Sequence, residues 1–544
     1  MFISQFQKFT RFLLAITLGS LVAACSGGER ESDIAASEGI LLFGNGSEPK
    51  GLDPHLVTGV PENHIISSLI EGLIAYHPTD DLVPAPGMAE SWESNDDYTV
   101  WTFKLRDDAA WSNGDPVLAS DFAYSWERIL TPMLGSEYAP MLYVIKGAQA
   151  FHAGETEDFS TVGVNAIDDK TLEVTLAGPT PYFLNMLKHY SFFPVNPRAV
   201  EENGGMTDRQ SGWSTLENYV GNGPFKLKSW VTNQVIEVER NPTYWDAENV
   251  KLNGIRFFPV ENGATEETMF RSGRLHITSI VPPDKIPSLK ESVPDQLMIE
   301  PYLGSYFYRV NVTRPPFDNV KVRQALAVSF DKELLVEKVT KGGQNAATGY
   351  VPNGIPGYAT STTVQYDPEL GKKLLAEAGY ADGVGFPKTE ILINTSESHR
   401  KIAEAMQAMW KDNLGIDVGI YNQEWKVYLD SQSSLDYDLS RSGWIGDYVH
   451  ASTFLEMFTT GNGNNDTGWS SAQYDALIAK AQLAGSEEER SQVLSEAEEI
   501  LLAELPVIPI YWYTRVYMKD PQLKGWEPKV LDNRPYKHVY FEAN

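Results

Sequence analysis

The sequence is poor in the groups that several kinds of chemistry require. It has one cysteine among 544 residues, so no disulfide can form within the chain and any thiol chemistry would depend on that residue. The nine histidines include no pair at the i, i+4 spacing of a zinc-protease helix. No segment completes G-x-S-x-G, H-E-x-x-H, a Walker A loop or an EF-hand loop. We therefore expect a non-enzymatic protein without a metal or an organic cofactor, although paired carboxylates of the glycosidase kind leave one enzymatic interpretation open.

A hydrophobic run of the roughly 20 residues that cross a membrane as a helix is also lacking. At the N-terminus, Lys8 and Arg11 precede a shorter apolar run, which ends in small residues directly before Cys25. This order predicts an export signal peptide over residues 1–24 and a lipid-modified Cys25; the alternative is a buried free thiol. Residues 25–39 are then predicted to be a lipidated cysteine and a flexible tether, because Gly, Ser, Glu and Asp dominate them.

Positive charge is scarce. The chain has 44 Lys and Arg against 73 Asp and Glu, a formal net charge of −29. Such a chain repels nucleic acid and anionic lipid headgroups, so we expect no nucleic-acid partner. The charge otherwise indicates solubility and identifies no ligand. The length and the hydrophobic content of 42% predict two or more lobes with separate cores, and a cleft between lobes is a natural ligand site.

Strand and helix patterns alternate along the chain, which indicates the α/β class. Period-two alternation over residues 101–105 and 172–176 predicts half-buried strands. Asp367 followed by Pro368 predicts the start of a helix, with an N-cap and a proline at its first position. Successive strand and helix patterns between residues 301 and 514 predict an independent α/β lobe.

A long, ordered series of segments resembles one known family. The series includes GSEPKGLDPH at 46–55, EGL at 71–73, PAPGMAESW at 84–92, WSNGDPV at 111–117, DFAYSW at 121–126, GPF at 223–225, RNPTYW at 240–245, PFDNVKVRQA at 316–325 and LLAEAGY at 374–380. By these segments the chain is similar to the bacterial extracellular solute-binding proteins of family 5, and most closely to the periplasmic oligopeptide-binding members. A series that covers nearly the whole chain is far more specific than a single short motif.

The resemblance implies the two-lobed α/β fold of periplasmic binding proteins, in the class with an extra subdomain inserted in the first lobe. It places lobe I at residues 40–72, 198–300 and 515–544, the inserted subdomain at 73–197 and lobe II at 301–514. Two crossovers would join the lobes, and hinge closure would enclose the ligand in the cleft between them.

The resemblance also implies a set of ligand-binding residues, mostly in lobe II. Within RSGWIGDY at 441–448, Asp447 matches the carboxylate that pairs with the α-amino group of a peptide, and Arg441 matches an arginine that serves the C-terminal carboxylate. The backbone of Gly443, Trp444 and Ile445 matches the segment that pairs with the ligand as a strand would. Taken without the resemblance, Asp447 and Arg441 would be interpreted as surface charges.

Further residues are carried over with weaker support. His399 matches a histidine that reaches the C-terminal carboxylate of some ligands, and Trp425 matches a tryptophan that lines a side-chain pocket; ordinary packing is the alternative for both. Glu62, Tyr138 and Tyr302 are weaker matches still. One departure concerns Gln432, which stands where related proteins have an arginine, so the preferred peptide length is left open.

These features predict the binding component of an ABC importer, which captures short peptides and delivers them to a membrane permease. The expected partners are short peptides and the permease and ATPase subunits. The protein is expected to be monomeric and to lie in the periplasm, lipid-anchored to a membrane through Cys25. The alternatives are a receptor of the same fold for an oligosaccharide, haem or a metal chelate, a glycoside-acting enzyme, and a role in sensing peptides rather than in nutrition.

Overall fold

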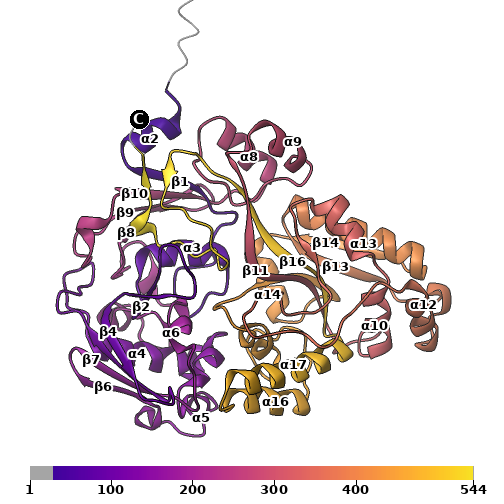
Figure 1. The fold of residues 1–544 in the computed structure, drawn as a ribbon, viewed down its shortest axis with the longest axis horizontal. Helices are drawn as coiled ribbons and strands as arrows, with labels where there is room; N and C mark the ends of the chain where they lie inside the picture. Colours follow the sequence, from indigo (N-terminus) through magenta and orange to yellow (C-terminus); the bar gives the residue numbers. More distant parts are fainter. Residues whose placement is uncertain (1–28, 543–544) are drawn as a thin grey trace, which may run out of the picture.

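The computed structural model describes residues 29–542 (Figure 1). The predicted signal peptide and Cys25 lie outside the described residues. Among the residues that are described, none of the helices combines the length and the apolar character needed to cross a membrane. Two bodies of mixed sheet and helix are visible in Figure 1, and a pair of long strands runs between them.

The first body, which we call lobe I, is built on a four-stranded sheet. Its strand order is β1 (Ile40–Gly44), β10 (Gly254–Phe258), β9 (Val235–Arg240) and β8 (Phe225–Val231), with β1 parallel to β10 and the other pairs antiparallel. Helices α3 (Val60–Leu69), α8 (Gly263–Arg271) and α9 (Ile286–Ser292) accompany it, and the short strands β17 (Leu523–Lys524) and β18 (Tyr540–Phe541) form a hairpin near the C-terminus. The sheet therefore combines strands from the beginning and the middle of the chain.

The prediction of a flexible tether over residues 25–39 is wrong for its described helical part, because Glu31–Ser37 form helix α2. Ala35 is buried in a hydrophobic cluster with Leu42 of β1. The backbone N–H of Ser32 donates to the carbonyl of Gly273 at 2.7 Å, and the carbonyl of Ser32 accepts from His276 Nε2 at 2.9 Å. One apolar side chain and two long-range hydrogen bonds hold this helix against lobe I. The polar composition of the segment, on which the prediction of a tether was based, indicates neither contact.

A segment inserted between β1 and β8 carries a second four-stranded sheet. Its order is β4 (Ala89–Ser94), β5 (Val100–Leu105), β7 (Thr171–Thr175) and β6 (Val164–Asp168), antiparallel throughout, and its helices are α4 (Ala119–Leu130), α5 (Ala148–His152), α6 (Phe183–Met186) and α7 (Pro197–Glu202). A short hairpin of β2 (Ile74–Tyr76) and β3 (Pro84–Pro86) precedes them. The two predicted strands are confirmed as β5 and β7, and the inward side chains of β5 are buried as the alternation requires.

Lobe II is built on a mixed six-stranded sheet. Its order is β12 (Asn345–Ala346), β16 (Val507–Met518), β11 (Leu297–Val310), β15 (Leu439–Ile445), β13 (Thr389–Asn394) and β14 (Val418–Gln423). Its helices are α10 (Val320–Val328), α11 (Lys332–Leu335), α12 (Pro368–Glu377), α13 (Glu397–Leu414), α14 (Trp425–Ser433), α15 (Ser452–Leu455), α16 (Ala472–Gln482) and α17 (Glu487–Glu504). The predicted start of α12 is confirmed, because Asp367 Oδ1 accepts a hydrogen bond from the backbone of Leu370 at 2.9 Å.

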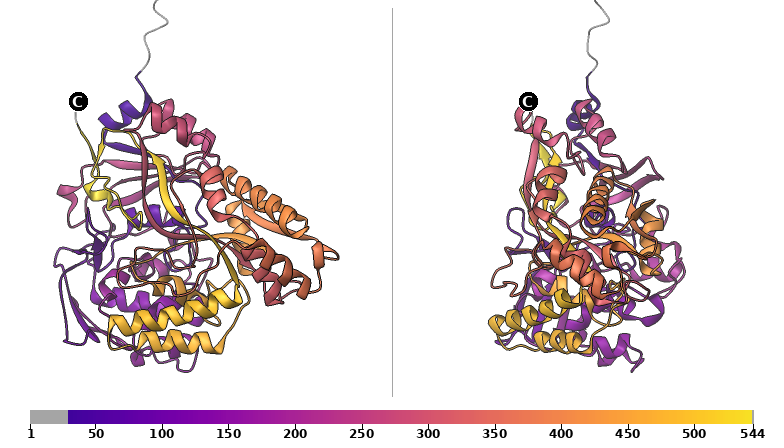
Figure 2. Two further views of the ribbon diagram at one scale, coloured as in Figure 1. Left: turned by 45° about the vertical axis from the view of Figure 1, so that its right-hand side comes forward. Right: turned by 90° about the vertical axis from the view of Figure 1, so that its right-hand side faces the viewer.

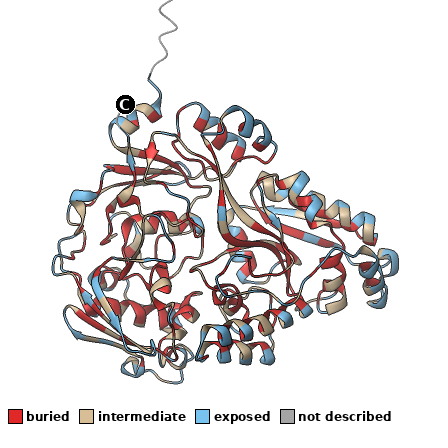
Figure 3. Ribbon diagram, in the orientation of Figure 1, coloured by how far each residue is buried: buried red, intermediate tan, exposed pale blue. Residues whose placement is uncertain are grey.

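Strands β11 and β16 are the connection between the lobes. Residues 305–309 of β11 pair with β16 inside the lobe II sheet, whereas residues 297–301 pair with the end of β16 after a register shift. Beyond that shift, Lys519 bridges to Ile277, which in turn bridges to Phe43 of β1. The two strands thus run from one sheet to the other (Figure 2), buried within the lobe II sheet and mostly only partly buried where they cross (Figure 3). Two crossovers of this kind let the lobes rotate relative to each other with little change inside either one.

Candidate ligand-binding site

A cavity of about 390 Å³ lies between lobe I, the inserted segment and lobe II. Nine of the ten residues predicted as ligand contacts line it: Tyr138, Tyr302, His399, Trp425, Arg441, Gly443, Trp444, Ile445 and Asp447. Tyr138 comes from the inserted segment and Tyr302 from the crossover strand β11. The other seven lie on α13, α14 and β15 or in the loop that follows β15. The fold therefore brings together side chains that are far apart in the sequence.

Asp447 lies just beyond the end of β15 with its carboxylate in the cavity. Tyr138 donates a hydrogen bond to Oδ1 at 3.1 Å and Thr453 donates to Oδ2 at 2.8 Å. Burial raises the pKa of the Asp447 carboxyl to about 7, against the opposing effect of these two hydroxyl donors. Because this carboxyl group lies at the cavity wall and is costly to ionise without a cation nearby, it is suited to bind a cationic ligand group.

The strand that leads to Asp447 has an open edge along the cavity. Gly446 N donates to the Leu303 carbonyl of β11 at 2.8 Å, so by alternation the backbone of residues 441, 443 and 445 faces away from β11. On the side away from β11, strand β13 pairs with Leu439 and Ser440. No described strand pairs with residues 441–445 on this side. An extended ligand can add a strand there.

Gly443 leaves room for Tyr513 on one face of β15. A Cβ atom at this position would lie 2.5 Å from the hydroxyl oxygen of Tyr513, so a side chain here would displace that tyrosine. The absence of a side chain thus lets Tyr513 pack against the strand.

Arg441 presents a partly buried positive charge in the cavity. Nη1 donates to Asn394 Oδ1 at 3.2 Å and Nη2 donates to the Tyr513 hydroxyl at 3.0 Å, while Nε has no partner among the described residues. The guanidinium lies 5.0 Å from the ring centre of Tyr306. Arg515, which also lines the cavity, pairs with Asp532 at 2.6 Å. Of these two arginines, Arg441 is the one whose described contacts are all neutral, so it can bind an anionic ligand group.

His399 lies in the first turn of α13, next to Arg441. The helix begins after β13 ends, and the Ser396 hydroxyl caps it by accepting from the His399 backbone N–H at 3.4 Å. Burial, with the nearby Arg441, lowers the pKa of the imidazole well below its ordinary value. His399 is therefore neutral at pH 7 and can contribute a hydrogen bond but no charge.

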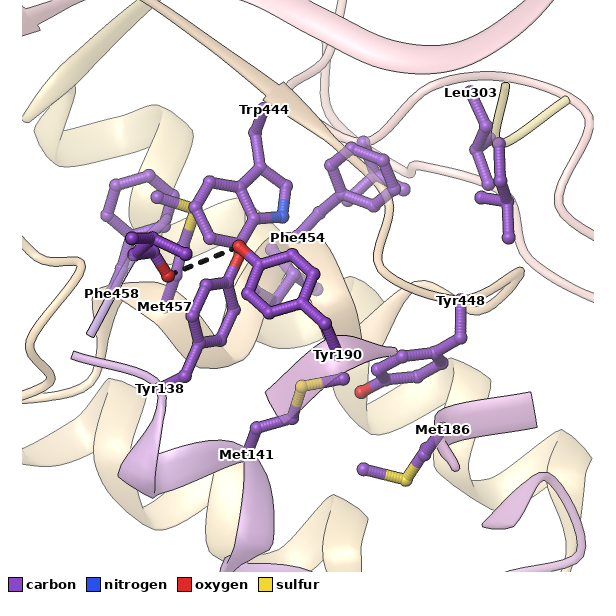
Figure 4. Packing of buried hydrophobic residues seen from close by; sticks show 14 of the residues in the cluster. Tyr138, Met141, Met186, Tyr190, Leu303, Trp444, Tyr448, Phe454, Met457 and Phe458 are labelled. Atoms are coloured by element: carbon purple, nitrogen blue, oxygen red, sulfur yellow. Dashed lines mark hydrogen bonds between the residues drawn. The ribbon is translucent and has the colours of Figure 1, made fainter. Parts of the chain in front are cut away.

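Two further predicted residues form aromatic walls. Tyr302 packs edge-on against Tyr513, with ring centres 5.8 Å apart. Trp425 stacks on Tyr428 at 5.7 Å, and its Nε1 has no hydrogen-bond partner among the described residues. Figure 4 shows a third aromatic group, in which Tyr138 and Tyr190 of the inserted segment meet Trp444 of β15.

Glu62 is the one predicted contact that does not line the cavity. Its side chain is fully buried in α3, and Oε1 accepts from the Lys50 backbone N–H at 2.6 Å. Burial raises the pKa of this carboxyl, which the Lys50 N–H opposes. Its contact with Gly59 and its proximity to Trp425 place it beneath the cavity floor.

Gln432 also lies away from the cavity. It is buried in α14, where Nε2 donates to Ser440 Oγ at 2.9 Å and to the Arg441 carbonyl at 3.1 Å. The Tyr428 hydroxyl donates to the same carbonyl. Gln432 and Tyr428 thus occupy the edge of β15 at the carbonyl of residue 441, and Gln432 does not line the cavity.

Sequence reasoning missed several residues of the site, among them Asn394, His189, Thr453 and Tyr513. Asn394 ends β13 and Tyr513 lies on the crossover strand β16, where their patterns indicate only strand positions. His189 Nε2 lies 3.3 Å from Asp447 Oδ1 although the two belong to different bodies. No local signal in the sequence distinguishes these residues from ordinary core positions.

Fold and site define a two-lobed binding protein that encloses its ligand between lobes joined by two crossover strands. Residues 83–466 match the family described as bacterial extracellular solute-binding proteins, family 5 Middle. The chain belongs to this family.

The comparisons extend over nearly the whole chain. The periplasmic oligopeptide-binding protein OppA of Salmonella typhimurium is 37% identical over 521 residues, which cover 93% of each chain. The crystal structure of Haemophilus influenzae OppA in complex with RPPGFSPFR matches with a TM-score of 0.88 at 36% identity, covering 93% of this chain and 99% of the other.

One relative reports on the arrangement of the lobes. The Escherichia coli murein tripeptide binding protein MppA matches with a TM-score of 0.88, whereas its unliganded open form matches with 0.62, both at 35% identity and covering 92% and 93% of this chain. The lobes of the present structure are therefore not in that open arrangement. The contacts across the cleft described above belong to a closed molecule.

Proposed function

We propose that this protein is the substrate-binding component of an ABC importer and that it captures short peptides in the cavity between its lobes. The observation that carries the proposal is the order of groups along one strand. Asp447 can take an ammonium, the open edge of residues 443–445 can pair with amides, and Arg441 can take a carboxylate. A free peptide offers these three kinds of group in one extended chain.

The relatives support the same ligand class. The names of curated relatives include oligopeptide-binding proteins from Salmonella typhimurium and Bacillus subtilis, and a structural relative holds the peptide RPPGFSPFR. These relatives are binding proteins, which favours transport over catalysis for this chain. Closure would bring Tyr138 of the inserted segment onto Asp447 of lobe II, so a ligand in the cavity would contact both sides of the cleft.

The test is thermal unfolding of protein that has been unfolded and refolded to remove any bound ligand. Peptides of two to twelve residues are compared, each with free and with blocked termini. A ligand at about 100 times its Kd stabilises the folded state by roughly 2.7 kcal/mol, which a melting curve resolves readily. Stabilisation that requires a free amino terminus supports the proposal. No stabilisation by any peptide contradicts it and favours an oligosaccharide, haem or a metal chelate; turnover of glycosides would instead favour an enzyme.

We further propose the domain division and the setting of the protein. Lobe I would comprise residues 40–72, 198–300 and 515–544, the inserted subdomain 73–197 and lobe II 301–514, in keeping with how the strands group into sheets. The protein would act as a monomer at a membrane, with the permease and ATPase subunits as its partners.

Replacing Cys25 with serine should release the protein from the membrane fraction into the soluble fraction. The thiol would carry the lipid, and no described helix offers another way to cross the bilayer. Fractionation of cells that express the wild type and Cys25→Ser checks this, with Ser26→Ala as the matched control that keeps the thiol. Membrane association of Cys25→Ser equal to that of the control would contradict the anchor.

Affinity for a peptide with a free amino terminus should pass through a maximum between about pH 7 and pH 8. The Asp447 carboxyl has a raised pKa of about 7, so its anionic form is present above that pH and is lost as the pH falls through it. The α-amino group of a peptide has a pKa of about 7.7–8.0 and loses its charge above that range. Below pH 7 the affinity should fall about tenfold per unit.

Isothermal titration from pH 5 to pH 9 measures this profile, and proton release on binding below pH 7 can be read from buffers of different ionisation enthalpy. The same peptide with an acetylated amino terminus is the control and should show no maximum. A flat profile for the free peptide would contradict the role of Asp447.

A further inference from the structure

A histidine from the opposite side of the cleft approaches the carboxylate of Asp447. His189 of the inserted segment places Nε2 3.3 Å from Asp447 Oδ1, the oxygen that also accepts from Tyr138. Asp447 and its other hydroxyl donor, Thr453, belong to lobe II. The His189 contact therefore exists only when the inserted segment and lobe II are together.

The tautomer of His189 follows from its other nitrogen. The backbone N–H of Ser191 donates to Nδ1 at 3.3 Å and cannot accept, and the Ser191 hydroxyl, 2.9 Å from the same nitrogen, can donate to it as well. Nδ1 therefore carries the lone pair, and Nε2, the nitrogen that lies 3.3 Å from Asp447 Oδ1, carries the proton. The ring is 5% exposed and packs against Tyr190 and Tyr138, with ring centres 4.0 and 4.7 Å away.

His189 approaches Asp447 without carrying a charge. Burial lowers the pKa of its imidazole to about 3, and protonation of Nδ1 would set two N–H groups against each other at Ser191. The contact at 3.3 Å is thus between a neutral ring and a carboxyl group and is not an ion pair. The two hydroxyl donors to Asp447, Tyr138 and Thr453, are neutral as well.

We propose that His189 is a positioning residue for the ligand amine: it orients the Asp447 carboxylate from across the cleft and leaves the negative charge of that carboxylate for the ligand ammonium. The proposal rests on the proposed function. A lysine or arginine at this place would form an ion pair with Asp447 and so compete with the ligand. A neutral donor fixes the geometry, and the cavity retains its selectivity for a cation.

The surroundings of the pair are consistent with this role. The further titratable groups that interact with Asp447 are one carboxyl, Glu456 after α15, and four tyrosines, namely Tyr76, Tyr190, Tyr350 and Tyr448. Arg490 acts on Glu456 but is itself bound to Glu487 at 2.8 Å. The charge of Asp447 is accordingly not matched by a nearby free cation among the described residues.

The test compares His189→Phe, which keeps a planar ring and removes the donor, with His189→Gln, which keeps a neutral donor. His152→Phe is the matched control, because His152 lies in the same inserted segment and bonds Tyr143 outside the cavity. The probes are Ala-Ala-Ala, RPPGFSPFR and the N-acetylated form of each, titrated calorimetrically from pH 5 to pH 9.

For the free peptides, His189→Phe should bind about tenfold more weakly than the wild type, as expected for one lost hydrogen bond to a charged group. Its affinity for the acetylated peptides should be unchanged, and the pH below which free-peptide affinity falls should move upward because Asp447 loses a donor to its anionic form. His189→Gln and His152→Phe should resemble the wild type in all three respects.

Two results would overturn the inference while leaving the proposed function in place. One is His189→Phe binding free peptides as the wild type does; the other is an equal loss for free and acetylated peptides, which marks a structural role. Should His189→Phe fail to fold, nitrogen NMR of the wild type decides, since a proton on Nδ1 instead of Nε2 refutes the proposal. A wild type that binds none of the four probes refutes the proposed function and this inference with it.

Discussion

Asp447→Asn should lower the affinity for peptides with a free amino terminus by about a hundredfold or more and should affect N-acetylated peptides far less. Truncating one partner of a buried, hydrogen-bonded charge pair typically costs about 2–5 kcal/mol or more. Asparagine keeps the shape of the side chain and can still accept from Tyr138 or Thr453, so the loss reports the missing charge. Calorimetric titration of matched free and acetylated peptides measures both affinities.

Asp412→Asn is the matched control, because this exposed carboxylate lies on α13 of the same lobe. It should bind both peptide forms as the wild type does. Asp447→Ala should show the same selectivity as Asp447→Asn with a larger total loss. Equal losses for the free and the acetylated peptide in both Asp447 variants would mean that the carboxylate does not bind the ammonium.

The same substitution should stabilise the protein without ligand. The folded-state pKa of Asp447 is raised from 3.8 to about 7, so folding holds the proton more tightly than the unfolded chain does. The cost of ionising the buried group is absent below pH 3.8, grows up to pH 7 and is then constant, at a few kcal/mol. Asp447→Asn should therefore melt at a higher temperature than the wild type at pH 8 and at nearly the same temperature at pH 4.

Much of lobe II and of its ligand-facing strand could be predicted from the sequence, because family segments and local patterns coincide there. Asp447, Arg441 and Gly443 lie within one short segment, and a single strand carries them into the cavity. The helix start at Asp367 is a local hydrogen bond and is equally visible in the sequence. What is encoded within a few residues was predictable.

Contacts between distant segments could not be predicted from the sequence. His189 and Asp447 meet only because two bodies close on each other, and α2 docks through backbone hydrogen bonds to Gly273 that no composition reveals. Glu62 was assigned to the ligand by resemblance, yet its carboxylate lies buried beneath the cavity. A resemblance identifies a matching position, but only the packing shows which way its side chain points.

The position of Gln432 bears on which residue can bind the C-terminal carboxylate of a peptide. Its side chain bonds the carbonyl of Arg441 and does not line the cavity, so position 432 contributes no group to the ligand space of this chain. Arg441 remains the proposed site for an anionic ligand group, because the other arginine of the cavity wall, Arg515, is paired with Asp532.

Arg441→Met should therefore lower the affinity about a hundredfold for peptides of one length, the length at which the carboxylate reaches residue 441 when the amine is held at Asp447. The guanidinium is partly buried and its described partners are neutral, so its bond to a carboxylate is charge-assisted and largely shielded from water. Methionine has a similar length and no charge. Calorimetry on di- to penta-alanine, each with a free and an amidated C-terminus, measures the effect.

The dependence of the affinity loss on peptide length distinguishes a ligand-binding role of Arg441 from a structural role. For the one matching length, amidation of the peptide and Arg441→Met should each cost about the same, and the two together should cost little more than either, because both remove one interaction. Lys388→Met, which removes an exposed charge from the same lobe, should leave every affinity unchanged. If Arg441→Met weakened all lengths equally, amidated peptides included, the arginine would act through Asn394 and Tyr513 on the shape of the strand, and the carboxylate of the ligand would have to be bound elsewhere.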